Sequence, residues 1–287
     1  MAETEQERAA ETHDTAAPAE PHPAATSQEP ARPRRDWTRL VTRVALALGL
    51  GSVLIALLAA LGAGQGLWHF RIGFTVLRYA FFAAIAAIVI GIVGIALARR
   101  RRSAGLMLPN LLAVAVALAF VLYLGSLVMT AKSVPAIHDV TTNLDDVPQF
   151  SALKLREDNL DNIPDEKKPE LKAMDPESRW KAVHREHYGD LKTATVPLQP
   201  ADVIRKAGRL ARDRGWEVAK IDTAAGILEA TDTSRFFHFK DDVVVRARPA
   251  ADGSGSLVDM RSVSRVGASD VGVNAKRVRA FMGDLAK

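Results

Sequence analysis

The chain has 287 residues, a formal net charge of +5 and no cysteine, which excludes disulfides, thiolate catalysis and cysteine-ligated metal sites. Its basic balance is local: residues 31–130 contain 11 arginines and one acid, whereas residues 131–287 contain 26 basic and 25 acidic residues. The positive charge therefore belongs to the apolar part of the chain and does not indicate a nucleic-acid-binding face.

The first 36 residues are rich in Ala, Glu, Thr and Pro and show no apolar periodicity. A segment of this composition cannot bury enough apolar surface to offset the entropy that it loses on ordering. We expect a disordered tail, which is either featureless or a binding segment.

Three long apolar runs follow, at residues 44–64, 79–98 and 106–129. Each has about 20 residues or more, enough for a helix to cross about 30 Å of hydrocarbon. The sequence therefore predicts a three-helix transmembrane region over residues 37–130. The runs contain no acid and no lysine, which argues against the alternative of a transport pathway.

Small and special residues give details of this region. Gly91 and Gly94 lie three residues apart in the second apolar run and predict close packing between helices. Pro109 is expected in the first turn of the third helix, where its missing N–H costs least.

Arginines flank the apolar runs asymmetrically. Five lie just before the first run, within residues 32–43, and four fill residues 99–102, whereas the aromatic loop at 65–77 carries only Arg71. By the positive-inside rule, the N-terminus and residues 99–102 are cytoplasmic. After three crossings, everything beyond residue 130 lies outside, in the periplasm of a bacterium with the helices in its inner membrane. The first run is too long and too far from the N-terminus for a cleaved signal, so a retained anchor is expected.

The soluble part begins with a mixed segment, residues 131–193, which we interpret as a linker or an extended wrap with one short helix at 176–188. Residues 194–287 have the patterns of a compact core. Helices are predicted at 200–214 and 271–285, and strands at 195–198, 216–221, 226–231, 242–248 and 256–264.

This order, β-α-β-β-β-β-α, predicts an α+β fold in which two helices cover one face of an antiparallel sheet. Alternation within the strands supports the arrangement. Val243 and Val245 point to one face and Arg246 to the other, so the sheet should be apolar toward the helices and charged on its opposite face.

The strongest local pattern is the strand–turn–helix stretch at 259–278. Ser269 or Asp270 can cap the last helix. Arginines near the start of that helix would form an anion pocket with Asn274, because helix N-termini and guanidinium groups both favour anions. The expected arginines are Arg261, Arg265 and Arg277. The alternative is a structural network in which Asp270 caps the helix and pairs with an arginine.

Several segments resemble the DUF1499 family, a domain of unknown function. They are RSVSRVG at 261–267, SDVGVN at 269–274 with Arg277 and Val278, FKDDV at 239–243, and IHDVTTN at 137–143. The resemblance covers about residues 135–285 and implies a membrane-attached or exported domain, without an activity to carry over. Many relatives have a cysteine near the domain start, which this chain lacks.

Other candidate residues carry open alternatives. Phe237 and Phe239 could line an apolar cleft, touch the bilayer or plug one end of the core. Asp241 and Asp242 point to opposite faces of a strand, so capping or ion pairing is expected rather than acid–base chemistry. His138 could anchor the domain start through hydrogen bonds.

His184 and His187 lie three residues apart without a third ligand, so no metal and no cofactor are expected. The hypothesis is an uncharacterised inner-membrane protein with a periplasmic, non-enzymatic binding or envelope-structural domain. Its partners would be the bilayer and a small anion, a lipid or an envelope protein, and no nucleic acid. The alternative is an enzyme of unrecognised type that uses His238, Asp241, Asp242 and the region of Arg261, Arg265 and Asp270.

Overall fold

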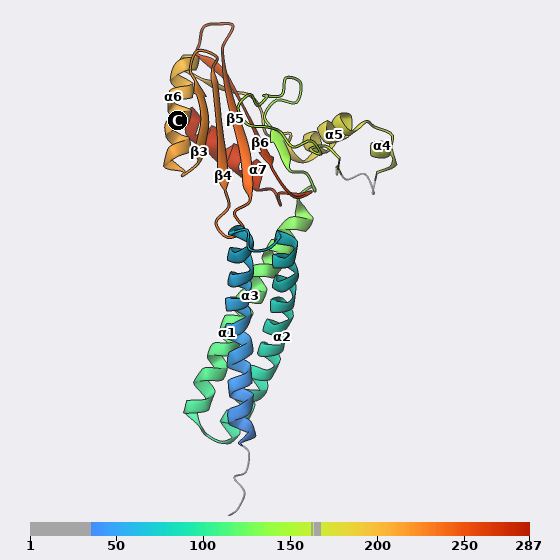
Figure 1. The fold of residues 1–287 in the computed structure, drawn as a ribbon, viewed down its shortest axis with the longest axis vertical. Coiled ribbons are helices and arrows are strands. Elements are labelled where there is room, and N and C mark those ends of the chain that lie inside the picture. The colour runs from blue at the N-terminus through green and yellow to red at the C-terminus, as the bar shows by residue number, and fades with distance from the viewer. Residues whose placement is uncertain (1–35, 162, 164–167) are drawn as a thin grey trace, which may run out of the picture. The chain divides into compact units, whose positions relative to one another are not determined.

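The computed structural model describes residues 36–161, 163 and 168–287 (Figure 1). The predicted disorder and cytoplasmic location of the tail concern residues 1–36, which lie almost entirely outside the described part. Three helices come first, each long and apolar enough to cross a membrane. They are α1 (Trp37–Gly64), α2 (Phe70–Arg100) and α3 (Ala104–Ser133).

The helices extend beyond the apolar runs that predicted them. The loop between α1 and α2 shortens to residues 65–69, because α2 already begins at Phe70 with His69 as its N-cap. The helix α3 starts at Ala104, so Pro109 lies inside it and not in its first turn as predicted. Apolar runs mark only the part of a helix that suits hydrocarbon, and the polar ends of each helix continue past it.

Small side chains let these helices approach closely. Ala84 and Ala87 of α2 and Ala117 of α3 are buried against one another. Asn110 of α3 is fully buried, and its Nδ2 donates to Thr42 Oγ1 of α1 at 2.8 Å and to the Leu106 carbonyl at 2.7 Å. This polar contact inside the bundle had no counterpart among the sequence predictions.

Gly94 of α2 makes room for this contact, since a Cβ atom at this position would overlap the side-chain amide of Asn110. We expect Gly94→Ala to destabilise the helix bundle by about 1–3 kcal/mol, the usual cost of overpacking. Thermal unfolding of the full chain in nanodiscs measures this effect. Gly125→Ala in α3 is the control, because no atom lies within 4 Å of a Cβ there. Equal melting temperatures for the two variants would contradict the packing role.

The C-terminal domain, residues 139–287, is built on a six-stranded antiparallel sheet, which confirms the predicted α+β class. The strand order is β1-β6-β5-β4-β3, and β2 pairs with β6 beside β1. The strands are β1 (Asp139–Thr141), β2 (Ala194–Val196), β3 (Glu217–Asp222), β4 (Ile227–Thr233), β5 (Lys240–Pro249) and β6 (Ser256–Ser264). The structure adds one strand, β1, to the five strands that the sequence predicts. The far edge, β3, carries a register irregularity between Val218 and Lys220.

Two long helices cover one face of the sheet (Figure 1). Val243 and Val245 of β5 and Met260 of β6 are fully buried in one apolar core with Ile204 and Phe281 from the two helices. The helices of this domain are α4 (Pro169–Lys172), α5 (Pro176–Tyr188), α6 (Pro200–Asp213) and α7 (Val273–Ala286), with α6 and α7 on the sheet.

The opposite face of the sheet is charged, as alternation predicts, but it is not open to solvent. Glu229 and Asp259 are fully buried there, and Arg261 is only 5% exposed. The segment that follows β1, residues 142–157, lies over this face and bonds to its side chains. Burying these charges requires that each be paired, and the pairing organises the candidate site.

Candidate functional site

Asp259 of β6 is the centre of one ionic cluster on the charged face. Its carboxylate accepts hydrogen bonds from Arg246 at 3.1 Å and from Arg248 at 2.8 Å, both on the neighbouring strand β5. Thr142 and Thr193 donate to it from the covering segments. None of the site predictions included Asp259, although its alternation against the two arginines was a usable signal.

Glu229 of β4 fixes the covering segment. Its oxygens accept from the backbone N–H groups of Ser151 at 2.8 Å, Ala152 at 2.9 Å and Leu153 at 2.8 Å. Burial acts to raise the pKa of Glu229, but the Ser151 hydroxyl and the backbone N–H groups lower it further, so the pKa lies below its usual value. The carboxylate therefore stays ionised and holds the segment in place.

Arg261 of β6 forms a two-pronged ion pair with Asp139 of β1. Its Nε donates to Asp139 Oδ1 at 2.9 Å and one terminal nitrogen donates to Oδ2 at 2.6 Å. The side chains are 6% and 1% exposed, so the pair is buried. Asn159 also donates to Asp139, at 2.6 Å.

Arg277 of α7 lies on the helix-covered face of the sheet. Its guanidinium donates to Asp232 at 2.8 Å and to Asp241 at 2.7 Å, and also to the Ser262 hydroxyl at 3.0 Å. Its side chain is 8% exposed. Asp241 is therefore one half of a structural ion pair.

The predicted convergence of Arg261, Arg265 and Arg277 near the start of α7 is wrong. Each guanidinium binds a different carboxylate, and Arg277 lies on the opposite face of the sheet from Arg261. The physical reason is that each buried charged side chain pairs with the nearest opposite charge. The register of the strands, and not the order of residues along the chain, determines which side chain is nearest.

Asp270 accepts hydrogen bonds at the start of α7, whose N-cap position is Gly272. Its carboxylate accepts from the N–H groups of Gly272 at 2.8 Å and Asn274 at 2.6 Å, whereas Ser269 accepts from Val271, which precedes the helix, at 3.1 Å. Burial raises the pKa of Asp270, against the effect of these hydrogen bonds. Among the described residues, the Asp270 carboxylate accepts only from backbone N–H groups, which supports the capping half of the structural alternative.

Asn274 and His138 tie the domain start to α7. Asn274 Nδ2 donates to the His138 carbonyl at 2.9 Å and to the Ser264 hydroxyl at 3.0 Å. Its Oδ1 accepts from Ser262 at 2.7 Å. The His138 ring is buried and lies 3.4 Å from both the Ala268 carbonyl and a nitrogen of Arg156. This arrangement is an anchoring network made of hydrogen bonds.

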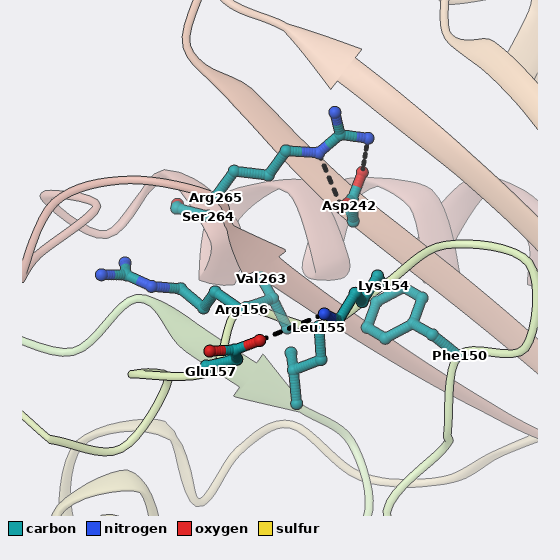
Figure 2. Close-up of a pocket in the computed structure, with 9 residues that line it drawn as sticks. All are labelled: Phe150, Lys154, Leu155, Arg156, Glu157, Asp242, Val263, Ser264 and Arg265. Carbon is teal, nitrogen blue, oxygen red and sulfur yellow. Dashed lines mark hydrogen bonds and ion pairs between the residues drawn. The ribbon is translucent and has the colours of Figure 1, made fainter.

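A cleft of roughly 360 Å³ lies between the covering segment and the adjoining ends of β5 and β6 (Figure 2). It brings together candidates from the sequence, Asp242 and Arg265, with cationic residues that the sequence analysis missed. The lining residues are Phe150, Lys154, Leu155, Arg156, Glu157, Asp242, Val263, Ser264 and Arg265.

Asp242 and Arg265 form one wall of the cleft (Figure 2). Nε of Arg265 donates to Oδ2 of Asp242 and its NH2 donates to Oδ1, both at 2.8 Å. NH2 also donates to Thr231 at 3.1 Å, and Thr231 in turn donates to Asp242 at 2.7 Å. Both Asp242 oxygens thus accept hydrogen bonds, whereas the second terminal nitrogen of Arg265 has no partner among the described residues.

Lys154 and Arg156 supply the other cations. Lys154 pairs with Glu157 at 3.1 Å, and both side chains are more than 80% exposed, so a ligand can displace this pair at little cost. Arg156 is held by the Gly267 carbonyl at 2.7 Å and by Asp158. Its hydrogen bond lowers the pKa of Asp158 to about 2. The cleft can accept an anionic group between Lys154 and Arg265.

The histidines of α5 do not form a metal site in this structure. His184 Nε2 accepts from the Thr141 N–H at 3.1 Å, and His187 Nδ1 lies 3.0 Å from the Val183 carbonyl. Across the described residues, no three or more His, Asp or Glu side chains are grouped as metal ligands. His184 instead connects α5 to β1.

Burial lowers the pKa of His184 from 6.5 to about 4. Between these two pH values, the His184 side chain is protonated in the unfolded chain and neutral in the folded chain. Stability is therefore lost as the pH falls through this window, by up to roughly 3 kcal/mol. We expect His184→Gln, which keeps an acceptor for Thr141, to lack this component when urea unfolding is compared at pH 7 and pH 5. An identical pH dependence in both proteins would contradict this role.

Comparison with known proteins identifies the family of the C-terminal domain. A family model described as "Protein of unknown function (DUF1499)" matches residues 139–285, just over half of the chain. No curated protein and no solved structure gives a significant match. The matched range contains the sheet, its two covering helices and the cleft. The chain therefore belongs to the DUF1499 family, with three potential membrane-spanning helices before the family domain.

Proposed function

We propose that this protein holds a non-enzymatic binding domain on the periplasmic side of the bacterial inner membrane. The arrangement of α1, α2 and α3 supports an odd number of crossings. Arg99 and Arg100 end α2 beside two further arginines, whereas the opposite end of α2 begins with aromatic residues. The positive-inside rule then assigns the arginine end to the cytoplasm and the domain to the outside.

Reporter fusions at Lys287 test this orientation. An alkaline phosphatase fusion should be active, because the enzyme folds only where disulfides form, and a green fluorescent protein fusion should stay dark. The opposite pair of results would place the domain in the cytoplasm. It would leave the fold and the cleft unchanged.

The observation that carries the binding function is the cleft with its three cations, Lys154, Arg156 and Arg265. Among the described residues, one terminal nitrogen of Arg265 has no acceptor, and Lys154 is held by an exposed ion pair alone. Guanidinium and ammonium groups together favour phosphate or carboxylate. The ligand class that fits is a small anion or an anionic lipid headgroup.

The contacts of the acidic candidates favour binding over catalysis. Asp241 and Asp242 point to opposite faces, and Arg277 and Arg265 bind them separately. Asp270 serves as a helix cap. A general acid or base needs a carboxylate oxygen within reach of a substrate proton, and these oxygens already accept hydrogen bonds within the fold.

Lys154→Glu tests the anion site in the full chain reconstituted in nanodiscs. Inorganic phosphate at tenfold excess over its Kd should raise the melting temperature of the wild type by about 3–6 °C relative to chloride at equal ionic strength. The variant should lose most of this increase, because the cleft then carries an added negative charge. Replacing phosphatidylcholine by phosphatidylglycerol distinguishes a lipid headgroup from free phosphate.

Lys276→Glu is the matched control, since Lys276 is exposed on α7 and does not line the cleft. It should keep the full response to phosphate. Equal responses in both variants, or no response in the wild type to phosphate or to anionic lipid, would exclude the anion site.

A further inference from the structure

The turn that joins β4 to β5 is aromatic and ordered. Ser234 N–H donates to the Phe239 carbonyl, and Phe239 N–H donates back to the Ser234 hydroxyl, both at 2.8 Å. His238 has a φ of 49°, a left-handed conformation that helps to close the turn. Phe237 and Phe239 stack with centroids 5.3 Å apart. The turn, residues 234–239, is thus a rigid projection of the sheet.

These aromatic residues do not belong to the apolar core. Phe236 is 42% exposed, and the Arg235 guanidinium lies 5.9 Å from its ring centroid. The core cluster of the domain includes none of the turn residues. The contacts therefore do not support the alternative in which this segment plugs one end of the core.

Chain connectivity places this turn at the end of the sheet where the chain leaves the membrane helices. The helix α3 ends at Ser133, and β1 begins at Asp139. Five intervening residues span at most about 20 Å. Asp139 pairs with Val263, which pairs with Asp242 near the start of β5. The turn precedes that point directly, so it projects from the membrane-proximal end.

Ring contacts with α2 agree with this placement. Phe239 lies 5.6 Å from Phe70, and Phe237 lies 4.9 Å from Phe74, between ring centroids. Both α2 residues belong to its first two turns, at the end of the helix opposite Arg99 and Arg100. The strand register and the ring contacts thus agree in placing the turn near the same end of the three helices.

We propose that the turn at 234–239 is a second membrane contact, in which Phe236 enters the boundary between headgroups and acyl chains and Arg235 binds lipid phosphate. Aromatic side chains favour this boundary and arginine favours anionic headgroups. Lipid, rather than a protein, is the occupant because the turn continues the lipid-facing surface of α2. The contact fixes the height and tilt of the domain above the bilayer, and it does not depend on a ligand in the cleft.

The absence of cysteine allows a direct test in the full chain. Phe236→Cys, labelled with an environment-sensitive fluorophore and reconstituted in nanodiscs, should give several-fold brighter emission than a label in water. Lipids brominated near the carbonyl should quench it, and aqueous iodide should quench it little. Asp252→Cys is the control, because Asp252 lies in the exposed turn at the opposite end of β5.

Three results would overturn the proposal. The first is strong iodide quenching at residue 236, equal to that at residue 252. The second is protection from iodide without quenching by brominated lipid, which would indicate a protein partner. The third is equal quenching by brominated lipid at both positions. Arg235→Cys provides a second label position if Phe236→Cys does not fold, since Arg235 is exposed and makes no hydrogen bond to the part of the chain that the structure describes. It should show the same quenching pattern.

Discussion

Replacing Arg261 by leucine is expected to lower the free energy of unfolding of the C-terminal domain by about 3–5 kcal/mol, the usual effect of removing one partner of a buried ion pair. The Asp139 carboxyl group would lose its cationic partner in a site that is 1% exposed, with Asn159 as its remaining side-chain donor. The pair also joins β1 to β6 across 122 residues of chain. Urea unfolding of the full chain in nanodiscs, followed by tryptophan fluorescence, measures the change.

The matched control is Arg205→Leu on the surface of α6. Arg205 pairs with Asp202, but both side chains are more than half exposed, so the expected effect is below about 1 kcal/mol. A similar small effect for Arg261→Leu would show that water reaches Asp139. It would contradict the burial of the charged face.

Glu229→Gln is the second substitution with a large expected effect, about 2–3 kcal/mol. The side chain keeps its shape, so no cavity forms, but an amide group replaces one of the oxygens that accept from Ser151, Ala152 and Leu153. Two sets of N–H donors then face each other in a buried site. We expect the covering segment to loosen before the sheet does.

Hydrogen exchange distinguishes this local loosening from global destabilisation. The amides of residues 151–153 should exchange faster in Glu229→Gln, while those of β5 and β6 keep most of their protection. Glu217→Gln is the control, because Glu217 is largely exposed on the edge strand β3. Unchanged exchange at 151–153 would show that other contacts hold the segment.

Local patterns account for most of the secondary structure that was predicted. Alternation located β6 at residues 256–264, the same bounds as in the structure, and Pro176 marked the start of α5. The strand β1 was missed because it has three residues, all buried, and therefore no alternation. Its pairing with β6 depends on contacts far apart in the chain, which no local pattern encodes.

The candidate site was predictable only in part, for the same reason. Arg265 and Asp242 lie in segments that resemble the family, and the caps at the start of α7 are local interactions. Lys154 and Arg156 lie in a mixed-charge segment without periodicity, so nothing in the sequence connected them to the sheet. Only the convergence of Arg261, Arg265 and Arg277 was predicted wrongly, because residues that are near in sequence need not be near in space.

The two edges of the sheet are protected by different means, and this matters where copies of the chain meet side by side. Short strands β1 and β2 occupy the outer side of β6, so its backbone groups are already paired. The other edge, β3, has a register irregularity between Val218 and Lys220 and carries three charged side chains, Glu217, Lys220 and Asp222. Short edge strands, irregular register and charges discourage intermolecular strand addition. Neighbouring copies are therefore protected from polymerising through their sheets, even at high concentration.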